Sequence, residues 1–264
     1  MGKRILITGC SSGLGRAMAA ELARRGHAVV ATARRRATIA DLDVAQHLAL
    51  DVMSDQSVAD AVGAAGAIDI LINNAGVTVW GAVESPSATD VQRIFDTNVF
   101  GALRVLRGFL PAMRARKAGA IYQISSAAAR RSTALLGHYA ATKAALEAYS
   151  EALRIELAPF GIDVCIVSLG AIETKFGDNR QEVISPDYAD LAARVKGRIA
   201  ASRKVPWSAE SVAVRIADAI EAGKPPLRLD GTSDAFALIA QRTTLADDEW
   251  ERRTLADLWR SQAA

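Results

Sequence analysis

The chain has 264 residues, of which 50% are hydrophobic and 23% are charged. Its 32 basic residues are nearly balanced by 29 acidic ones and form no extended basic run, so nucleic acid is not expected as a partner. Cys10 and Cys165 have no metal-like spacing, which predicts free thiols and no metal site. No apolar segment is long enough for a signal peptide or a membrane span, so we expect a cytoplasmic protein without membrane contact.

The first two thirds of the chain alternate short β-rich runs with helical patterns. This rhythm predicts an α/β fold, a doubly wound Rossmann domain covering 1–264, with about seven parallel strands and helices on both faces. Thr89 and Gln92 have the spacing of a capping box at the start of one long helix. The expected strands are 3–8, 27–33, 46–52, 68–73, 120–125 and 162–169, and the helices between them are 14–25, 54–62, 89–116 and 137–160.

The last third of the chain has a different pattern. Residues 171–206 carry scattered charges and two prolines with modest apolar periodicity, which indicates a substrate lid. Ser208 is expected to cap a helix over 208–222, and 227–229 to form a short edge strand. A C-terminal helical extension is expected over 234–264.

A glycine-rich turn follows the first strand and opens the first helix. Gly9, Gly13 and Gly15 permit positive φ and close approach of a phosphate, while the helix N-terminus offers unpaired N–H groups and a positive dipole end. The spacing alone also fits a tight structural turn. For a dinucleotide, the expected contacts are Gly9, Ser11, Ser12, Gly13, Leu14 and Gly15.

The end of the second strand indicates which dinucleotide binds. An acidic side chain there would bind the adenosine ribose, but the chain has three arginines at 34–36 instead. We therefore predict a preference for NADP(H), with Arg34 as the leading phosphate contact and NAD(H) as a possible second cofactor; a solvated arginine loop is the alternative. Asp51 and Val52 end the third strand and either approach the adenine or merely close the strand.

Tyr139 and Lys143 are separated by one helical turn and would share one face of a helix. A fixed ammonium near a phenol favours the phenolate, so we expect Lys143 to lower the pKa of Tyr139. The Tyr-x-x-x-Lys spacing is weak evidence when it stands alone.

Together these motifs resemble the short-chain dehydrogenase/reductase family, in its compact single-domain branch, from Lys3 to about Thr174. The motifs that agree in order and spacing are Thr8-Gly-x-x-x-Gly-x-Gly15, Asp51-Val52, Asn73-Asn-Ala-Gly76, Asn98, and Ser126 with Tyr139 and Lys143. The resemblance implies that Ser126 holds the substrate carbonyl, Tyr139 transfers the proton, Lys143 binds the nicotinamide ribose and Asn98 holds a water. It also implies cofactor contacts at Asn74, Ala75, Gly76, Gly170, Ile172 and Thr174.

One departure from the family pattern lies at 169–170, where Leu-Gly replaces the usual Pro-Gly. The loss of the proline is expected to loosen the lid hinge. The long helices at 89–116 and 137–160 resemble the dimerisation surfaces of the family, which implies a homodimer or homotetramer.

A mostly apolar pocket wall is expected from Trp80, Leu135, Leu136, His138 and Phe176 with the segment 180–205. Such a wall favours a hydrophobic or medium-sized carbonyl substrate. His138 equally fits a solvent-facing helix start. Arg130 and Arg131 either bind an anionic group of the substrate or belong to a surface loop.

The leading hypothesis is therefore an NADPH-preferring carbonyl reductase that acts on a ketone, or catalyses the reverse alcohol oxidation. A non-catalytic NADP(H)-binding regulator and an NAD-preferring alcohol dehydrogenase of the same fold are alternatives. A nucleotide-sugar epimerase or dehydratase is disfavoured because its Gly-x-x-Gly-x-x-Gly turn is missing.

Overall fold

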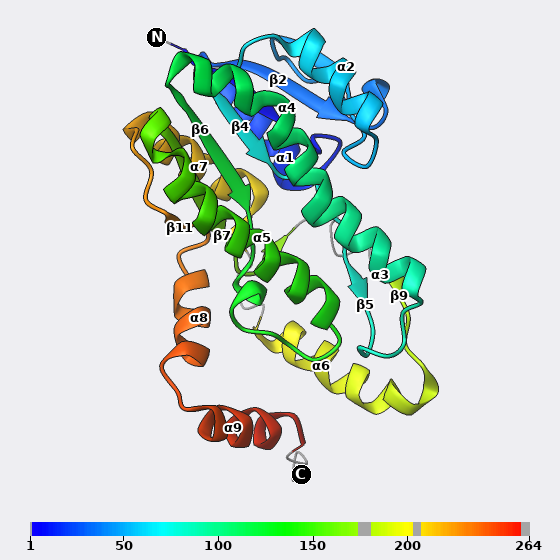
Figure 1. Ribbon diagram of the computed structural model, residues 1–264. Helices are drawn as coiled ribbons and strands as arrows, with labels where there is room; N and C mark the ends of the chain where they lie inside the picture. The colour runs from blue at the N-terminus through cyan, green and yellow to red at the C-terminus, as the bar shows by residue number, and fades with distance from the viewer. Residues whose placement is uncertain (1, 174–180, 203–206, 260–264) are drawn as a thin grey trace.

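The computed structural model describes residues 2–173, 181–202 and 207–259. Its central sheet has seven parallel strands in the order β11-β7-β6-β4-β1-β2-β3, flanked by helices (Figure 1). This arrangement confirms the doubly wound α/β fold expected from the sequence. The strands are β1 Arg4–Ile7, β2 Ala28–Ala33, β3 Gln46–Ala49, β4 Ile70–Asn73, β6 Gly119–Ile124, β7 Ile162–Ser168 and β11 Arg228–Asp230.

Alternate residues of the buried strands point to opposite faces of the sheet and build two cores. In β1, Ile5 and Ile7 belong to the core beneath α1 and α7, whereas Leu6 belongs to the core beneath α2 and α4. In Figure 1, α4 and α5 lie in front of the sheet and α1 and α7 behind it. These helices are α1 Gly13–Arg24, α2 Asp55–Ala65, α4 Gly101–Arg116, α5 Gly137–Leu157 and α7 Ala209–Ala222.

The sheet order reverses at β1, which pairs with β2 on one side and with β4 on the other. The crevice outside the carboxyl ends of strands at such a switch point is where ligands bind in open α/β sheets. The glycine-rich turn follows β1, and the Asn74-Ala-Gly76 loop follows β4. The fold therefore brings these two sequence motifs to one crevice.

The helix expected over 89–116 differs from the prediction in two ways. It is divided into α3 (Ala88–Phe95), a π-helical segment (Asp96–Phe100) and α4, and the wide turn contains Asn98. The capping box is formed by Ser87 and Asp90, so the assignment to Thr89 and Gln92 was wrong. The observed pair satisfies the N–H groups at the true helix start, two residues earlier than expected.

The C-terminal third combines short strand pairs with helices. β5 (Val79–Trp80) pairs with β9 (Gln181–Glu182), and β8 (Ile172–Glu173) pairs with β10 (Trp207–Ser208). Ser208 caps α7 as expected, because its side chain accepts a hydrogen bond from Ser211 N. The remaining elements are α6 Ala189–Ser202, α8 Ala235–Thr243, α9 Asp247–Trp259 and the 3₁₀ turns Arg36–Ile39, Ala127–Ala129, Ala158–Phe160 and Pro186–Tyr188.

The lid expected over 171–206 is described in part. Its strand β9 is held by α3, since Gln181 accepts from Arg93 at 2.6 Å and donates to Asp90 at 2.8 Å. Asp90 thus takes part both in the cap of α3 and in the contact with β9. Within the described part of the chain, no helix is both long and apolar enough to cross a membrane.

The cap assignment gives a direct stability prediction. Ser87→Ala removes the side-chain acceptor from the start of α3 and should lower the free energy of unfolding by about 1 kcal/mol in a urea titration. Thr89→Ala is the matched control, because the Thr89 side chain is exposed and lies inside the helix. A larger loss for Thr89→Ala than for Ser87→Ala would contradict the observed cap.

Candidate active site

The glycine-rich turn has the geometry that a bound diphosphate requires. Gly9 and Gly13 have φ of +76° and +57°, a region that favours glycine. A Cβ on Gly15 would lie 2.3 Å from the Gly9 carbonyl oxygen, so only glycine lets the helix begin this close to the strand. At these glycines the backbone of the turn can therefore lie close to a ligand, with no side chain in between.

The N-terminus of α1 is open toward the same site. Ser12 precedes the helix in an extended conformation, and its side chain makes no capping hydrogen bond among the described residues. The first-turn N–H groups and the positive dipole end are thus available to an anion. A cavity of about 670 Å³ adjoins them, lined in part by Ser11, Ser12, Gly13 and Arg16. This turn fits the diphosphate of a dinucleotide.

Thr8 ties the loop after β4 to the glycine-rich turn. Its hydroxyl accepts hydrogen bonds from the backbone N–H groups of Asn74 and Ala75, both at 3.0 Å. The Asn74 side chain donates back to the carbonyls of Thr8 at 2.9 Å and Gly9 at 3.2 Å. The structure thus places Asn74 and Ala75 against the turn, as their cofactor assignment requires.

The arginine run begins where β2 ends, next to the same turn. Cys10 N donates to the Thr32 carbonyl at 2.8 Å, which places the turn two residues from Arg34. Arg34 is exposed and has no side-chain hydrogen bond or ion pair with any described residue. A guanidinium in this position is available to a phosphate.

Asp51 and Val52 have local structural roles. The Asp51 carboxylate accepts from Met53 N at 3.0 Å, which closes the turn after the strand. Val52 is 7% exposed, and a Cβ on Gly101 would lie 2.8 Å from its side chain. These contacts agree with the alternative in which Asp51 closes the strand.

The start of α5 brings Tyr139 to Ser126. Ser126 follows β6, and its hydroxyl makes a hydrogen bond to the Tyr139 phenol. The neighbouring Ser125 instead donates to Glu147 at 2.8 Å in the interior. The two adjacent serines therefore have separate roles, and Ser126 is the one beside the tyrosine.

Lys143 lies one turn further along α5 and is 5% exposed. Its Nζ donates to the Ile124 carbonyl at 2.7 Å and lies 5.8 Å from the Tyr139 ring centroid. A Cβ on Gly76 would be 3.8 Å from this Nζ and 3.3 Å from Asn98 Oδ1. Lys143, Gly76 and Asn98 therefore meet at the ends of β4 and β6.

Asn98 anchors the chain that follows Gly76. Its Oδ1 accepts from Val77 N at 2.8 Å, and its Nδ2 donates to Val77 O at 2.9 Å and to Thr142 Oγ1 at 3.0 Å. Thr142 donates in turn to the Tyr139 carbonyl at 2.8 Å. Both amide hydrogens of Asn98 are thus in use, so its side chain can serve a water only as an acceptor.

Burial has opposite effects on the two titratable groups of α5. It raises the pKa of Tyr139 to about 12, against the lowering effect of the Ser126 hydrogen bond. It lowers the pKa of Lys143 to about 8, while the charge of Glu147 acts in the opposite direction. The expected lowering of the Tyr139 pKa by Lys143 is therefore not observed, because desolvation of the phenol dominates.

The apolar side chains expected to line the substrate pocket, where the structure describes them, pack against one another and are covered by other residues. Trp80 is 1% exposed and packs with Leu135 and with Ala192 and Val195 of α6, in a cluster that Leu136 also contacts. Helix α6 therefore covers these side chains. Phe176 lies outside the described residues, as does Thr174 of the expected cofactor contacts.

The other residues expected to contact substrate or cofactor near this cluster lie as follows. The Nε2 of His138 lies 2.9 Å from the Val83 carbonyl and donates to it. Arg131 is partly buried, and its side chain makes no hydrogen bond or ion pair within the described ranges; its burial and the charge of Arg198 lower its pKa. Gly170 lies against Asp234, whose carboxylate oxygen would be 2.4 Å from an added Cβ. Ile172 lies in β8.

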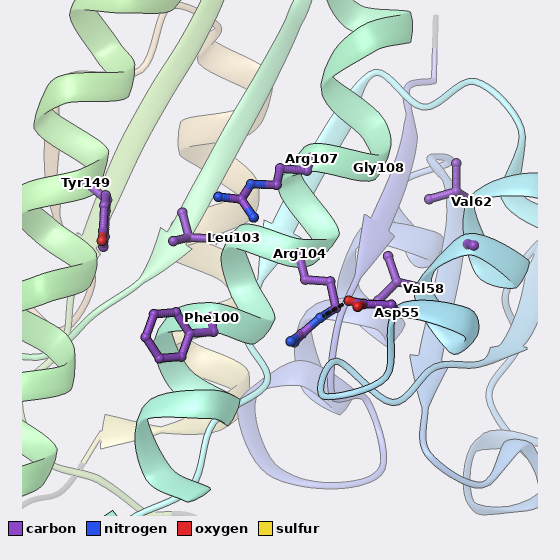
Figure 2. Close-up of a pocket in the computed structure, with 10 residues that line it drawn as sticks. Asp55, Val58, Val62, Phe100, Leu103, Arg104, Arg107, Gly108 and Tyr149 are labelled. Atoms are coloured by element: carbon purple, nitrogen blue, oxygen red, sulfur yellow. Dashed lines mark hydrogen bonds and ion pairs between the residues drawn. The ribbon is translucent and has the colours of Figure 1, made fainter. Parts of the chain in front are cut away.

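A second cavity, of about 780 Å³, lies away from these residues. Figure 2 shows Phe100, Leu103 and Tyr149 on one side of it and the Arg104–Asp55 ion pair on the other. The cavity lies among α2, α4 and α5, on the outer side of the helix layer. It contains none of the residues of the Ser126–Tyr139–Lys143 group.

Comparison with known proteins agrees with this geometry. A family model described as short chain dehydrogenase matches residues 3–184, and the chain belongs to this family. The 3-ketodihydrosphingosine reductase of Bacteroides thetaiotaomicron is 39% identical over 198 residues, covering 72% of this chain and 73% of the relative. Bovine (Bos taurus) retinol dehydrogenase 8 is 35% identical over 264 residues, covering 90% and 84%.

Solved structures support the same assignment. A short-chain dehydrogenase from Streptomyces avermitilis superposes with a TM-score of 0.82 at 36% identity, covering 96% of this chain and 97% of the other. One from Burkholderia cenocepacia, solved with NADP, gives 0.78 at 26% identity, covering 96% and 98%. The chain is thus an oxidoreductase of this family, and binding of a nicotinamide cofactor agrees with both the site and the neighbours.

Two residues of the site were not identified from the sequence. Thr142 lies inside the Tyr-x-x-x-Lys segment, and its contact with Asn98 required the fold to bring α5 to the π-helical segment. Glu147 follows Lys143 by one turn, a spacing that was visible in the sequence, but its partner Arg228 lies far away along the chain.

Proposed function

We propose that this protein is an NADPH-preferring carbonyl reductase that reduces a ketone to a secondary alcohol, and can catalyse the reverse reaction. The observation that carries the proposal is the hydrogen bond between the hydroxyls of Ser126 and Tyr139, with Lys143 one turn further along α5. These groups lie at the same sheet edge as the glycine-rich turn.

The arrangement suits a carbonyl group that gains electrons. A bound nicotinamide cofactor would supply a hydride to the carbonyl carbon, so that negative charge would develop on the carbonyl oxygen. The hydroxyls of Ser126 and Tyr139 stabilise that charge, and Tyr139 gives the oxygen its proton. The protonated Lys143 favours the phenolate that remains, which is the state that burial otherwise penalises.

The proton lost by Tyr139 has to be replaced from solvent. We propose that a water molecule connects Lys143 to solvent and donates a hydrogen bond to Asn98 Oδ1. The oxygen is the available atom, since both amide hydrogens of Asn98 are donated elsewhere. Lys143 would also bind the nicotinamide ribose from its position beside Gly76.

The substrate is proposed to be a largely apolar carbonyl compound. Support comes from the apolar cluster of Leu135 and Leu136 under α6, beside the start of α5. Two relatives are named for 3-ketodihydrosphingosine and for retinol, and another, from Arabidopsis thaliana, is named for a pterin aldehyde. Turnover of apolar ketones is therefore the first activity to measure.

Tyr139→Phe tests the catalytic assignment. We expect kcat/KM for NADPH-dependent ketone reduction to fall by about 10² to 10⁴, because the proton donor is lost. The dissociation constant for NADPH should stay close to that of the unaltered protein. Tyr149→Phe, at an exposed tyrosine of the same helix, is the control and should retain activity.

The outcomes separate the candidate functions. Full turnover by Tyr139→Phe would refute the general acid role of that residue. An unaltered protein that binds NADPH but reduces no ketone, quinone, steroid or oxo-acid would favour the non-catalytic regulator.

Cofactor preference is proposed to depend on Arg34. Its guanidinium is exposed at the end of β2 and has no partner among the described residues, so it is available to the 2′-phosphate.

Arg34→Ala should weaken NADPH binding by at least about tenfold and leave NADH binding nearly unchanged, because only NADPH carries the 2′-phosphate. Fluorescence titration with each cofactor measures both constants. Arg114→Ala removes an equal charge from an exposed site on α4 and should change neither constant. Equal weakening of both cofactors by Arg34→Ala would contradict the phosphate assignment.

We also propose that the chain forms a homodimer or homotetramer through α4 and α5. Phe100 and Tyr149 are 50% and 45% exposed beside the cavity of Figure 2, and such exposed aromatic side chains suit contact with a second copy.

Tyr149→Glu should shift the molecular mass in sedimentation equilibrium toward that of a single 27.9 kDa chain, because it introduces a charge into the apolar interface. Val83→Glu is the control, at a side chain that is 70% exposed elsewhere on the protein. An unaltered protein that sediments as a monomer would exclude the proposal.

A further inference from the structure

Glu147 is a buried carboxylate that the proposed reaction does not yet use. It lies on α5 one turn after Lys143, and it is 4% exposed. Ser125 Oγ donates to its Oε1 at 2.8 Å, and Arg228 Nη2 donates to its Oε2 at 2.9 Å. The carboxylate is therefore held from the end of β6 on one side and from β11 on the other.

The ion pair between Glu147 and Arg228 is a weak source of stability. A buried carboxylate is strongly unfavourable without partners, and even a well-paired buried ion pair is often no more stable than apolar side chains of similar volume. Arg228 also contacts the exposed Glu151 at 2.5 Å, so its guanidinium is shared between two carboxylates. Glu147 is thus held by an ion pair with Arg228, whose guanidinium it shares with Glu151.

Lys143 is the nearby group whose ammonium form the negative charge of Glu147 would stabilise. It is almost fully buried, and the hydrogen bond recorded for its Nζ goes to the neutral carbonyl of Ile124. Burial favours the neutral amine, whereas the charge of Glu147 favours the ammonium. Without a nearby anion, a larger fraction of Lys143 would lose its proton near neutral pH.

The groups around Lys143 come from several elements. On α5 they are Tyr139 and Glu147, with Glu151 two turns away; β11 contributes Arg228 through its bond to Glu147. The end of β6 contributes the Ile124 carbonyl and Ser125, and the π-helical segment contributes the neutral Asn98. Among these described groups, Glu147 and Glu151 are the two carboxylates, and Glu147 is the closer one to Lys143 along the helix.

We propose that Glu147 is a positioning residue that keeps Lys143 in its ammonium form, with Ser125 and Arg228 holding the carboxylate in place. This proposal rests on the proposed function, because the role proposed for Lys143 in catalysis requires the ammonium form that Glu147 maintains. Residues from the end of β6, from α5 and from β11 would then act on the catalytic group through Glu147.

Glu147→Gln tests the proposal with a side chain of the same shape. Loss of the negative charge should lower the pKa of Lys143, so the alkaline limb of the kcat/KM profile should move to lower pH by about one unit. Glu147→Asp keeps the charge and should restore the limb toward its original position. Glu156→Gln makes the same chemical change at an exposed site of α5 and should leave the profile unchanged.

A second readout does not depend on turnover. In a ¹³C NMR titration of the lysine Cε atoms, one signal should titrate near pH 8, because burial lowers the pKa of Lys143 to about 8, well below the value near 10.4 of exposed lysines. Lys143→Arg should remove that signal and so assign it. In Glu147→Gln the same signal should titrate at a lower pH.

The outcomes distinguish a failure of the proposed function from a failure of the role proposed for Glu147. Absence of any ketone turnover by the unaltered protein would count against the proposed function, while the NMR titration would still report on Glu147. An unchanged Lys143 titration in Glu147→Gln would overturn the positioning role, whatever the activity. Equal loss of activity in Glu147→Gln and Glu147→Asp with no shift of the alkaline limb would also overturn it, since that result indicates packing alone.

Discussion

The burial of Lys143 at the carboxyl end of β6 is the constraint on which the rest of the site depends. An ammonium is held away from water only where hydrogen-bond acceptors and compensating charge surround it. Here the Ile124 carbonyl supplies the acceptor and Glu147 supplies the charge. The start of α5 is therefore fixed against the sheet edge, and Tyr139, one turn earlier, is fixed with it beside Ser126.

The same edge also carries the parts that suit a dinucleotide. Thr8 joins the glycine-rich turn to the loop after β4, and Asn98 joins the continuation of that loop to α5. The π-helical segment places Asn98 where its amide reaches both Val77 and Thr142. Side-chain hydrogen bonds thus connect the glycine-rich turn to the loop after β4, and the continuation of that loop to the start of α5.

Sequence reasoning succeeded for features that depend on neighbours along the chain and failed where distant elements decide. The rhythm of strands and helices gave the fold, and Ser208 was found as a cap. The division of 89–116 at Asn98 was missed, because its amphipathic pattern runs through the wide turn without interruption. The pKa of Tyr139 was expected to fall, but burial raises it.

The sequence by itself determined the fold class and the family, and it singled out Ser126, Tyr139 and Lys143 as candidates, because local periodicity and motif spacing carry that information. Only the tertiary structure decided which charges act on that group. Arg228 reaches Glu147 across 81 positions of chain, and Ser125 reaches it across 22. Burial and long-range contacts set the protonation states of the site, and neither is encoded in the spacing of a motif.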